Sequence, residues 1–182
     1  MDRIQRVQSE AYSYPYHYIP SRNNNGDFIP TRIWGYARSW LAASSIVEKY
    51  IKEYCPKNGL HIDLGCGDGG LINYLACNDL KRIKYIGLDY DPKAIRWAKI
   101  FKVSKNVIFK CIDILDNSFK EMFEADTLSL IEVIEHIPPN KLRDFLKKAS
   151  SFIKIKGYLI LTVPHKNKTL QKKHFQHFSF QT

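Results

Sequence analysis

The stretch His61–Gly70 constrains the fold more than any other part of this sequence. An apolar run ends in Asp63, a glycine-dense turn follows, and apolar residues then recur at helical spacing. Glycine lets the backbone adopt positive φ and approach a ligand, and the next helix offers free N–H groups beside it. The pattern predicts a strand–turn–helix unit that binds a nucleotide cofactor. A turn that binds nothing stays open as the alternative, because a glycine-rich loop alone is a weak motif.

Length and composition predict one globular domain with a real core. The chain has 182 residues, of which 45% are hydrophobic and 13% aromatic, as in folded rather than disordered chains. No apolar run approaches the ~20 residues that span a bilayer. The N-terminal residues lack the apolar core of a signal peptide, which predicts a cytoplasmic protein. The cysteines show no zinc-site spacing and are interpreted as reduced packing residues: Cys55, Cys66, Cys77 and Cys111.

The positive charge is concentrated near the end of the sequence. Residues 140–182 carry a net charge of +9, whereas residues 1–139 carry +1. A basic face formed by this region predicts an anionic partner, such as RNA or a phosphorylated sugar. Lysines that only keep the domain soluble are an equally open interpretation.

Strands and helices are expected to alternate along most of the chain. Such alternation predicts an α/β fold with a doubly wound, mainly parallel sheet, truncated to about five strands, whose ligand lies at the carboxyl ends of the strands. The expected strands are 60–64, 83–88, 107–112, 127–133 and 157–163. The expected helices are 39–54, 70–77, 92–101 and 138–151.

Residues 1–38 are expected to form an aromatic N-terminal arm outside the domain of residues 39–182. The run Tyr12–Pro20 is punctuated by prolines, which favours extended or turn-like backbone, and no core element is expected in residues 1–30. The arm either docks on the domain or covers a cleft as a lid. Only 18 residues follow Pro164, so an exposed sheet edge must be covered by the tail, the arm or another subunit. Alternatively, the chain is a piece of a longer protein.

Three acidic residues stand at successive strand ends around the glycine turn: Asp63, Asp89 and Asp113. Asp89 follows Gly65 by 24 positions, where a carboxylate can accept both hydroxyls of a ribose. Each acid alone is more often an ordinary capping residue. Together they indicate a cofactor that contains adenosine.

With these motifs, residues 60–164 resemble the class I S-adenosylmethionine-dependent methyltransferases. The main alternative is a dehydrogenase, whose Gly-x-Gly-x-x-Gly motif more usually lacks an acidic residue before the first glycine. The resemblance implies that Asp63 orients the methionine portion and that Gly65 and Gly67 floor the site. It implies that Asp89 holds the ribose and that Asp113 meets the adenine. The implied cofactor-binding set also includes the neighbours Cys66, Tyr90 and Ile114.

The segment Glu132-x-x-Glu135-His136 follows the fourth expected strand and therefore faces the transferred methyl group. One helical turn would bring the two carboxylates and the imidazole to one side, where they could hold Mg²⁺ or a transition metal. Alternatively, the segment is only the entry to a helix, with His136 packed. Without a metal, His136 or Glu132 would act as the general base.

A second histidine pair, His174 and His177, lies in the tail. With the preceding segment, it resembles the small-RNA 3′-terminal 2′-O-methyltransferases, whose two glutamates and two histidines hold a metal. That resemblance implies Mg²⁺ or Mn²⁺. The tail departs from that family, since it lacks the Asp before the second histidine and the Glu-Trp after it. Quinone-pathway O-methyltransferases share the Glu-x-x-Glu-His pattern. The implied ligands are Glu132, Glu135, His136 and His177.

The sequence thus predicts an S-adenosylmethionine-dependent O-methyltransferase that acts on a small molecule, a sugar or an RNA end. The competing hypothesis is a non-catalytic partner subunit that binds the cofactor or an anionic ligand. The sequence does not predict the oligomeric state.

Overall fold

The structure is built on a five-stranded parallel sheet in the order β5-β4-β3-β6-β7. This confirms the predicted α/β, doubly wound class. The computed structural model describes residues 2–13, 15, 21–22, 28–29, 37–77, 79, 81–116, 119–120 and 122–179. The strands are β3 (Leu60–Leu64), β4 (Lys84–Asp89), β5 (Val107–Cys111), β6 (Ala125–Ile131) and β7 (Ile153–Thr162).

The register of the central strands brings polar residues to one level of the sheet. In β3, Asp63 lies beside Gly87 of β4 on one side and Ser129 of β6 on the other. The chain order of the strands reverses at β3, and such a switch point leaves a crevice above the carboxyl ends. The predicted ligand site therefore lies above the centre of the sheet.

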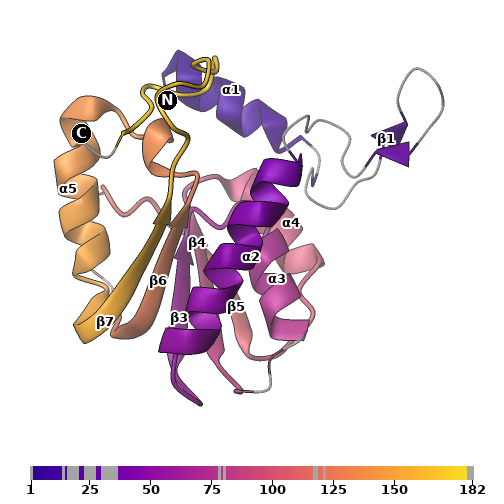
Figure 1. Cartoon of the computed structure of the whole chain (residues 1–182), viewed down its shortest axis with the longest axis vertical. Helices are drawn as coiled ribbons and strands as arrows, with labels where there is room; N and C mark the ends of the chain where they lie inside the picture. The colour runs from indigo at the N-terminus through magenta and orange to yellow at the C-terminus, as the bar shows by residue number, and fades with distance from the viewer. Residues whose placement is uncertain are drawn as a thin grey trace.

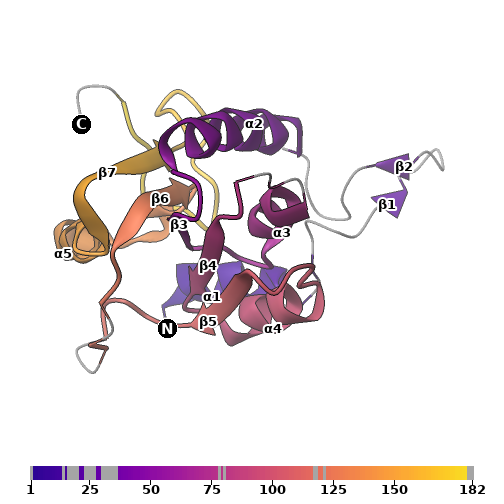
Figure 2. The same ribbon diagram turned by 90° about the horizontal axis from the view of Figure 1, so that it is seen from below.

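Helices cover both faces of the sheet (Figure 2). One face carries α2 (Ala37–Tyr54), α3 (Gly70–Cys77) and α4 (Pro92–Ile100), and the other carries α5 (Pro139–Ser150). Each face has its own apolar cluster, one around Ile72 and Ile95 and the other around Phe145 and Phe152. The start of α4 is fixed as expected, because Asp91 caps it by accepting from the Lys93 N–H at 2.8 Å.

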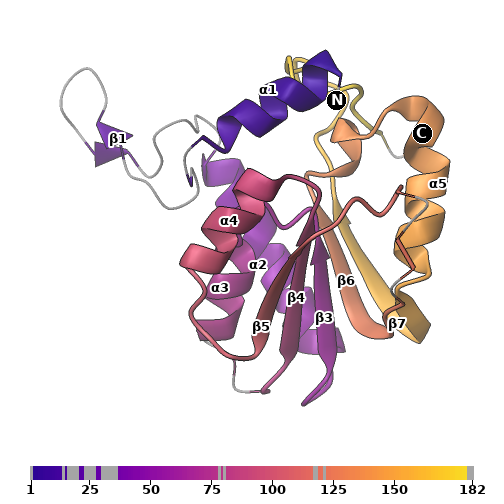
Figure 3. The same ribbon diagram turned by 180° about the vertical axis from the view of Figure 1, so that it is seen from behind.

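A further helix, α1 (Arg3–Ala11), crosses the carboxyl end of the sheet (Figures 1 and 3). The expectation that residues 1–30 hold no core element is wrong here, because Tyr12 at its end is buried. Its carbonyl accepts from the Trp97 indole N–H of α4 at 3.1 Å. The short strands β1 (Ser21–Arg22) and β2 (Phe28–Ile29) pair antiparallel. Most of the predicted aromatic run, including residues 16–20, lies outside the described residues.

Strand boundaries differ from prediction at the second half of the sheet. β7 begins at Ile153, four residues early, because the chain continues through an irregularity where Lys156 adopts φ 69°. β6 ends at Ile131, because Glu132 turns out of the strand with φ 53°. As an edge strand, β7 leaves apolar side chains such as Ile155 exposed. Across the described part of the chain, every helix falls short of the length or hydropathy of a membrane span.

Candidate functional site

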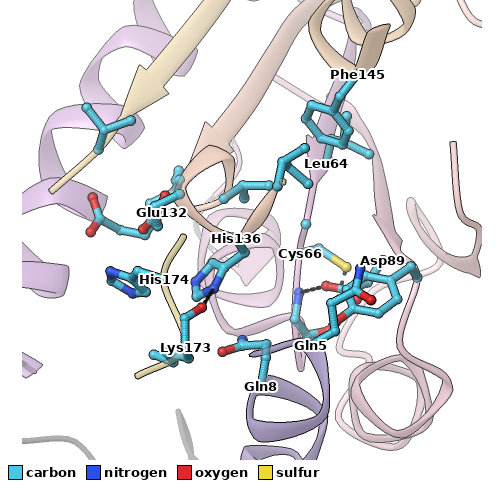
Figure 4. Close-up of a pocket in the computed structure, with 18 of the residues that line it drawn as sticks. Gln5, Gln8, Leu64, Cys66, Asp89, Glu132, His136, Phe145, Lys173 and His174 are labelled. Carbon is cyan, nitrogen blue, oxygen red and sulfur yellow. Dashed lines mark hydrogen bonds between the residues drawn. The ribbon is translucent and has the colours of Figure 1, made fainter. Parts of the chain in front are cut away.

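A cavity of about 400 Å³ lies above the carboxyl ends of the strands, under α1. Gln5, Gln8 and Tyr12 of α1 line one side of it. Figure 4 shows two groups of side chains in this cavity, with Cys66 and Asp89 in one and Glu132, His136, Lys173 and His174 in the other. We call the first the acidic half and the second the Glu-His half.

The glycine turn forms the wall of the acidic half in a conformation that side chains do not fit. Gly65 has φ 82° and Gly67 has φ 56°, both in the left-handed region. A Cβ on Gly65 would lie 2.5 Å from a methyl group of Val133, and a Cβ on Gly67 would lie 2.6 Å from the Tyr12 hydroxyl. Both positions therefore require glycine, because each has a positive φ and because a Cβ at either one would lie too close to a neighbouring side chain.

Asp89 ties the glycine turn to the end of β4. Its Oδ2 accepts from the Gly67 N–H and its Oδ1 accepts from the Asp91 N–H, both at 2.9 Å. Burial raises the pKa of Asp89 to about 6, and these two N–H groups oppose the shift. Each carboxylate oxygen keeps a second lone pair, so Asp89 can still accept from a ligand.

Asp63 lies in a buried hydrogen-bonded row that sequence analysis did not assign. The Ser129 hydroxyl donates to Asp63 Oδ1 at 2.5 Å and lies 3.2 Å from His61 Nε2. His61 Nδ1 lies 2.9 Å from the Thr127 hydroxyl. Burial raises the pKa of Asp63 to about 7 and lowers the pKa of His61 to about 3. At neutral pH a neutral histidine therefore supports Ser129, which holds the carboxylate of Asp63.

Every residue of the predicted cofactor set lines this one cavity. Asp113 is exposed at the rim, where its Oδ1 accepts from the Leu115 N–H at 2.9 Å. Ile114 and Cys66 are buried and present apolar surface. The complete set is Asp63, Gly65, Cys66, Gly67, Asp89, Tyr90, Asp113 and Ile114.

The Glu-His half is built on the one-turn helix η1 (Ile134–His136). Glu135 is fully buried, and neither carboxylate oxygen has a hydrogen-bond partner within the described structure. Burial, together with the neighbouring charge of Glu132, raises the pKa of Glu135 to about 8. Burial also raises the pKa of Glu132, against the opposing effect of Lys168. The pKa values of both acids thus lie above the value of a free glutamate.

The tail, which we define as the residues after Pro164, folds back onto η1 and supplies histidines to the site. The Phe175 N–H donates to the Glu135 carbonyl at 2.8 Å, and His136 Nδ1 lies 2.7 Å from the Lys173 carbonyl. The rings of His136 and His174 meet edge to face, with centroids 4.7 Å apart. Burial lowers the pKa of His136 to about 3, so this imidazole is neutral at physiological pH.

The structure gathers a metal-ligand group that differs from the predicted one. The predicted ligands are Glu132, Glu135, His136 and His177, whereas the ligand atoms of Glu135, His136 and His174 lie within 4.8 Å of one another. His177 instead contacts His174, with His174 Nδ1 2.7 Å from His177 Nε2. The orphaned carboxylate of Glu135 beside two neutral imidazoles fits a divalent cation by donor chemistry.

Comparison with known proteins gives a family match over most of the chain. A family model described as a methyltransferase domain matches residues 36–182. Carboxy-S-adenosyl-L-methionine synthase of Helicobacter pylori strain HPAG1 is 28% identical over 116 residues, covering 63% of this chain and 47% of that protein. A tRNA (guanine-N(7)-)-methyltransferase of Clostridium botulinum is 30% identical over 94 residues, covering 47% of this chain and 42% of that protein.

Solved structures support the fold. The N-methyltransferase NodS of Bradyrhizobium japonicum, in complex with S-adenosyl-L-homocysteine, matches with a TM-score of 0.65 at 14% identity, over 91% of this chain and 75% of that one. The PH0226 protein of Pyrococcus horikoshii matches with a TM-score of 0.56 at 27% identity, over 71% of this chain and 58% of that one. The chain spans about half the length of the curated relatives it matches.

Proposed function

The chain belongs to the methyltransferase-domain family, and from that premise we propose that it transfers a methyl group from S-adenosylmethionine to a hydroxyl oxygen. This identity confirms the resemblance to class I methyltransferases. The observation that carries the proposal is the single cavity with two chemically different halves. The acidic half suits the cofactor, and the Glu-His half suits an acceptor that must lose a proton.

In this proposal the acidic half holds the cofactor through the residues predicted from the sequence. Asp89 accepts from the ribose hydroxyls with its free lone pairs, while its bonds to the Gly67 and Asp91 N–H groups fix the carboxylate. Asp63, held by Ser129, attracts the ammonium group of the methionine portion. Asp113 at the rim accepts from the adenine amino group, and Tyr90, Cys66 and Ile114 flank the rings.

The chemical step is a displacement in line with the sulfur. The bond from methyl carbon to sulfur breaks as the bond to the acceptor oxygen forms, which leaves S-adenosylhomocysteine and a methyl ether. We assign the hydroxyl proton to Glu132, because burial raises its pKa toward the range of an effective base. Without a bound cation, His136 is the alternative base. A divalent cation in this half, predicted from the sequence as Mg²⁺ or Mn²⁺, would lower the pKa of the hydroxyl.

The acceptor is proposed to be a small molecule, a sugar or an RNA end that carries negative charge. Lys141, Lys168 and Lys173 line the cavity beside the Glu-His half, within the strongly basic region of residues 140–182. Positive side chains at a cavity mouth raise the local concentration of anionic ligands. A cytoplasmic location is part of this proposal, because cysteines such as buried Cys66 are free thiols.

The test is turnover of S-adenosylmethionine by the isolated chain. With catechols, nucleoside sugars and short RNA as acceptors, we expect S-adenosylhomocysteine to accumulate in step with methylated acceptor. Binding of S-adenosylmethionine without turnover on any acceptor would favour the non-catalytic partner subunit instead. If RNA is the acceptor, its affinity should fall steeply with salt; a flat salt response would exclude that class.

Cofactor affinity is expected to rise about 10-fold or more between pH 5 and pH 8. Burial raises the pKa of Asp89 to about 6 and of Asp63 to about 7, so both carboxylates ionise in this interval and attract a cationic ligand more strongly. Titration calorimetry of S-adenosylmethionine across this range measures the effect. Equal affinity at both ends of the range would contradict the assignment of these two residues.

The same two groups give the unliganded protein an opposite pH dependence. Because their folded pKa values lie above the unfolded ones, the folded state binds more protons, and stability declines as pH rises from about 4 through 7. Because the affinity for S-adenosylmethionine rises over the same range, the increase in melting temperature that this ligand produces should be larger at pH 8 than at pH 5. S-adenosylhomocysteine, whose sulfur is uncharged, serves as the control and should show the smaller pH effect.

A further inference from the structure

Glu135 is a buried carboxylate in the wall of the Glu-His half. It has no exposed surface and lines the cavity, and both its oxygens lack a hydrogen-bond partner. Leaving a buried polar group unpaired costs free energy that native structures normally avoid. Such a group at a cavity wall indicates a missing ligand that accepts electron pairs.

The hydrogen bonds of the nearby histidines determine where their free lone pairs lie. A carbonyl oxygen only accepts, so His136 donates from Nδ1 to the Lys173 carbonyl at 2.7 Å, and His177 donates from Nδ1 to the Lys168 carbonyl at 3.2 Å. In neutral His177, Nε2 then accepts from His174 Nδ1, which lies 2.7 Å away. This leaves Nε2 of both His136 and His174 with an unused lone pair.

We propose that Glu135, His136 and His174 bind one divalent transition-metal ion, with Zn²⁺ preferred to Mn²⁺ and Mg²⁺ weakest. One carboxylate with two imidazoles is a donor set that suits Zn²⁺, whereas Mg²⁺ requires mostly oxygen ligands. His177 is a positioning residue, because its bond to His174 Nδ1 fixes which nitrogen faces the ion. The proposal replaces the predicted ligands Glu132 and His177 by His174, and it revises the predicted metal.

Geometry and charge are compatible with this assignment. The three ligand atoms lie within 4.8 Å of one another, whereas a tetrahedral ion with bonds of about 2.1 Å holds its ligands about 3.4 Å apart. Rotation of the side chains toward a common centre closes that gap. Lys173 is the competing cation, because its charge acts on Glu135. Its long, flexible side chain can turn away when an ion enters.

The site also connects two distant parts of the chain. His174 belongs to the tail, and Glu135 and His136 belong to η1, which the tail contacts through the Phe175 N–H. An ion bound by all three would hold the tail against η1 and complete the wall of the Glu-His half. The role of the ion in methyl transfer rests on the proposed function, whereas its binding is measured without cofactor or acceptor.

The test is cation binding to the metal-free protein, after chelation and desalting. Calorimetry is expected to show one Zn²⁺ per chain, with Mn²⁺ weaker and Mg²⁺ at least about 10-fold weaker than Zn²⁺. Zn²⁺ should also raise the melting temperature, since it binds only the folded state. Absence of stoichiometric Zn²⁺ binding, or equal affinity for Mg²⁺, would overturn the proposal.

Variants separate this site from adventitious binding to surface histidines. Glu135→Gln and His174→Ala should each lose the Zn²⁺-dependent rise in melting temperature, and His177→Ala should weaken binding about 10-fold. His165→Ala is the matched control, because His165 is exposed in the same tail and outside the group; it should bind like the parent chain. Unchanged Zn²⁺ binding in both Glu135→Gln and His174→Ala would refute the site.

Two further measurements distinguish loss of the metal site from misfolding of a variant and from failure of the proposed methyl transfer. Co²⁺ in place of Zn²⁺ should give the intense visible bands of a tetrahedral ion, and these should vanish in His174→Ala even if Glu135→Gln does not fold. Methyl transfer is assayed separately. Zn²⁺ binding without methyl transfer would refute the proposed function and keep the site, and methyl transfer at full rate in excess chelator would refute only the role of the ion in catalysis.

Discussion

Asp89→Asn is expected to weaken the binding of S-adenosylmethionine about 100-fold. Asparagine retains one acceptor oxygen, so either the Gly67 N–H or the Asp91 N–H loses its partner, and the ribose loses a charged acceptor. Hydrogen bonds to charged groups contribute about 1.5–3 kcal/mol each, so losing one or two of them corresponds to this loss of affinity. Titration calorimetry at pH 8, where the parent carboxylate is ionised, gives the ratio directly.

Asp113→Asn is the matched control for this experiment. Asp113 also lines the cavity, two residues after β5, but it is exposed and its carboxylate accepts from the Leu115 N–H of its own turn. Because exposed groups contribute less than buried ones, we expect less than about a 10-fold loss of affinity. Equal effects of the two substitutions would show that Asp89 has no special place in cofactor binding.

Phe152→Ala is expected to lower the free energy of unfolding by about 3–5 kcal/mol. Phe152 is completely buried between α5 and the sheet, and its ring meets Phe123 edge to face with centroids 5.1 Å apart. The loss is a large share of the 5–15 kcal/mol that stabilises a typical domain. Urea denaturation followed by circular dichroism measures it, and the melting temperature should fall by roughly 10 °C.

The control for the core is Ile155→Ala, three residues further along the chain. Ile155 is 93% exposed on β7, so its truncation should change the free energy of unfolding by less than about 0.5 kcal/mol. The contrast separates burial from strand position. Similar effects of the two substitutions would show that the face of the sheet covered by α5 is not packed as described.

The order of strands and helices was predictable because apolar runs in this chain are followed by recognisable acidic and glycine residues where the strands end. β4 ends at an acid, Asp89, and in β3 the acid Asp63 is the residue before the last one, Leu64. What the sequence does not specify is irregular backbone. The first four residues of β7 were not predicted as part of the strand. Lys156 interrupts the regular backbone there, a glycine follows it, and the segment is rich in lysine.

The missed helix α1 did carry a signal, in Asp2 and Gln5. Asp2 accepts from the Gln5 N–H at 2.9 Å while the Gln5 side chain accepts from the Asp2 N–H at 3.1 Å, which is a capping box visible as Asp-x-x-Gln. The helix is polar overall, and its apolar residues Ile4, Val7 and Ala11 recur at helical spacing. Its place over the cavity depends on Tyr12 and Trp97, which are 85 positions apart.

The residues predicted for the acidic half all line the cavity, and their roles stay predictions, whereas the histidines of the Glu-His half group differently from the predicted set. Which tail histidine approaches Glu135 depends on the bond from the Phe175 N–H to the Glu135 carbonyl, and spacing does not encode that bond. The buried row of His61 and Ser129 was missed for a related reason. Their adjacency follows from the pairing of β3 with β6, which a list of strands does not provide.

The contact of the tail with η1 bears on when the cavity forms during synthesis. The acidic half includes Asp63, which is held by Ser129 of β6, so it requires β6 as well as β3 and β4. A nascent chain can still assemble it before the tail is made, because domains fold in the direction of translation. The opposite wall requires Lys173 and His174, which leave the ribosome after η1 and β7. Until they do, a growing chain has the acidic half of the cavity and lacks the wall that the tail supplies.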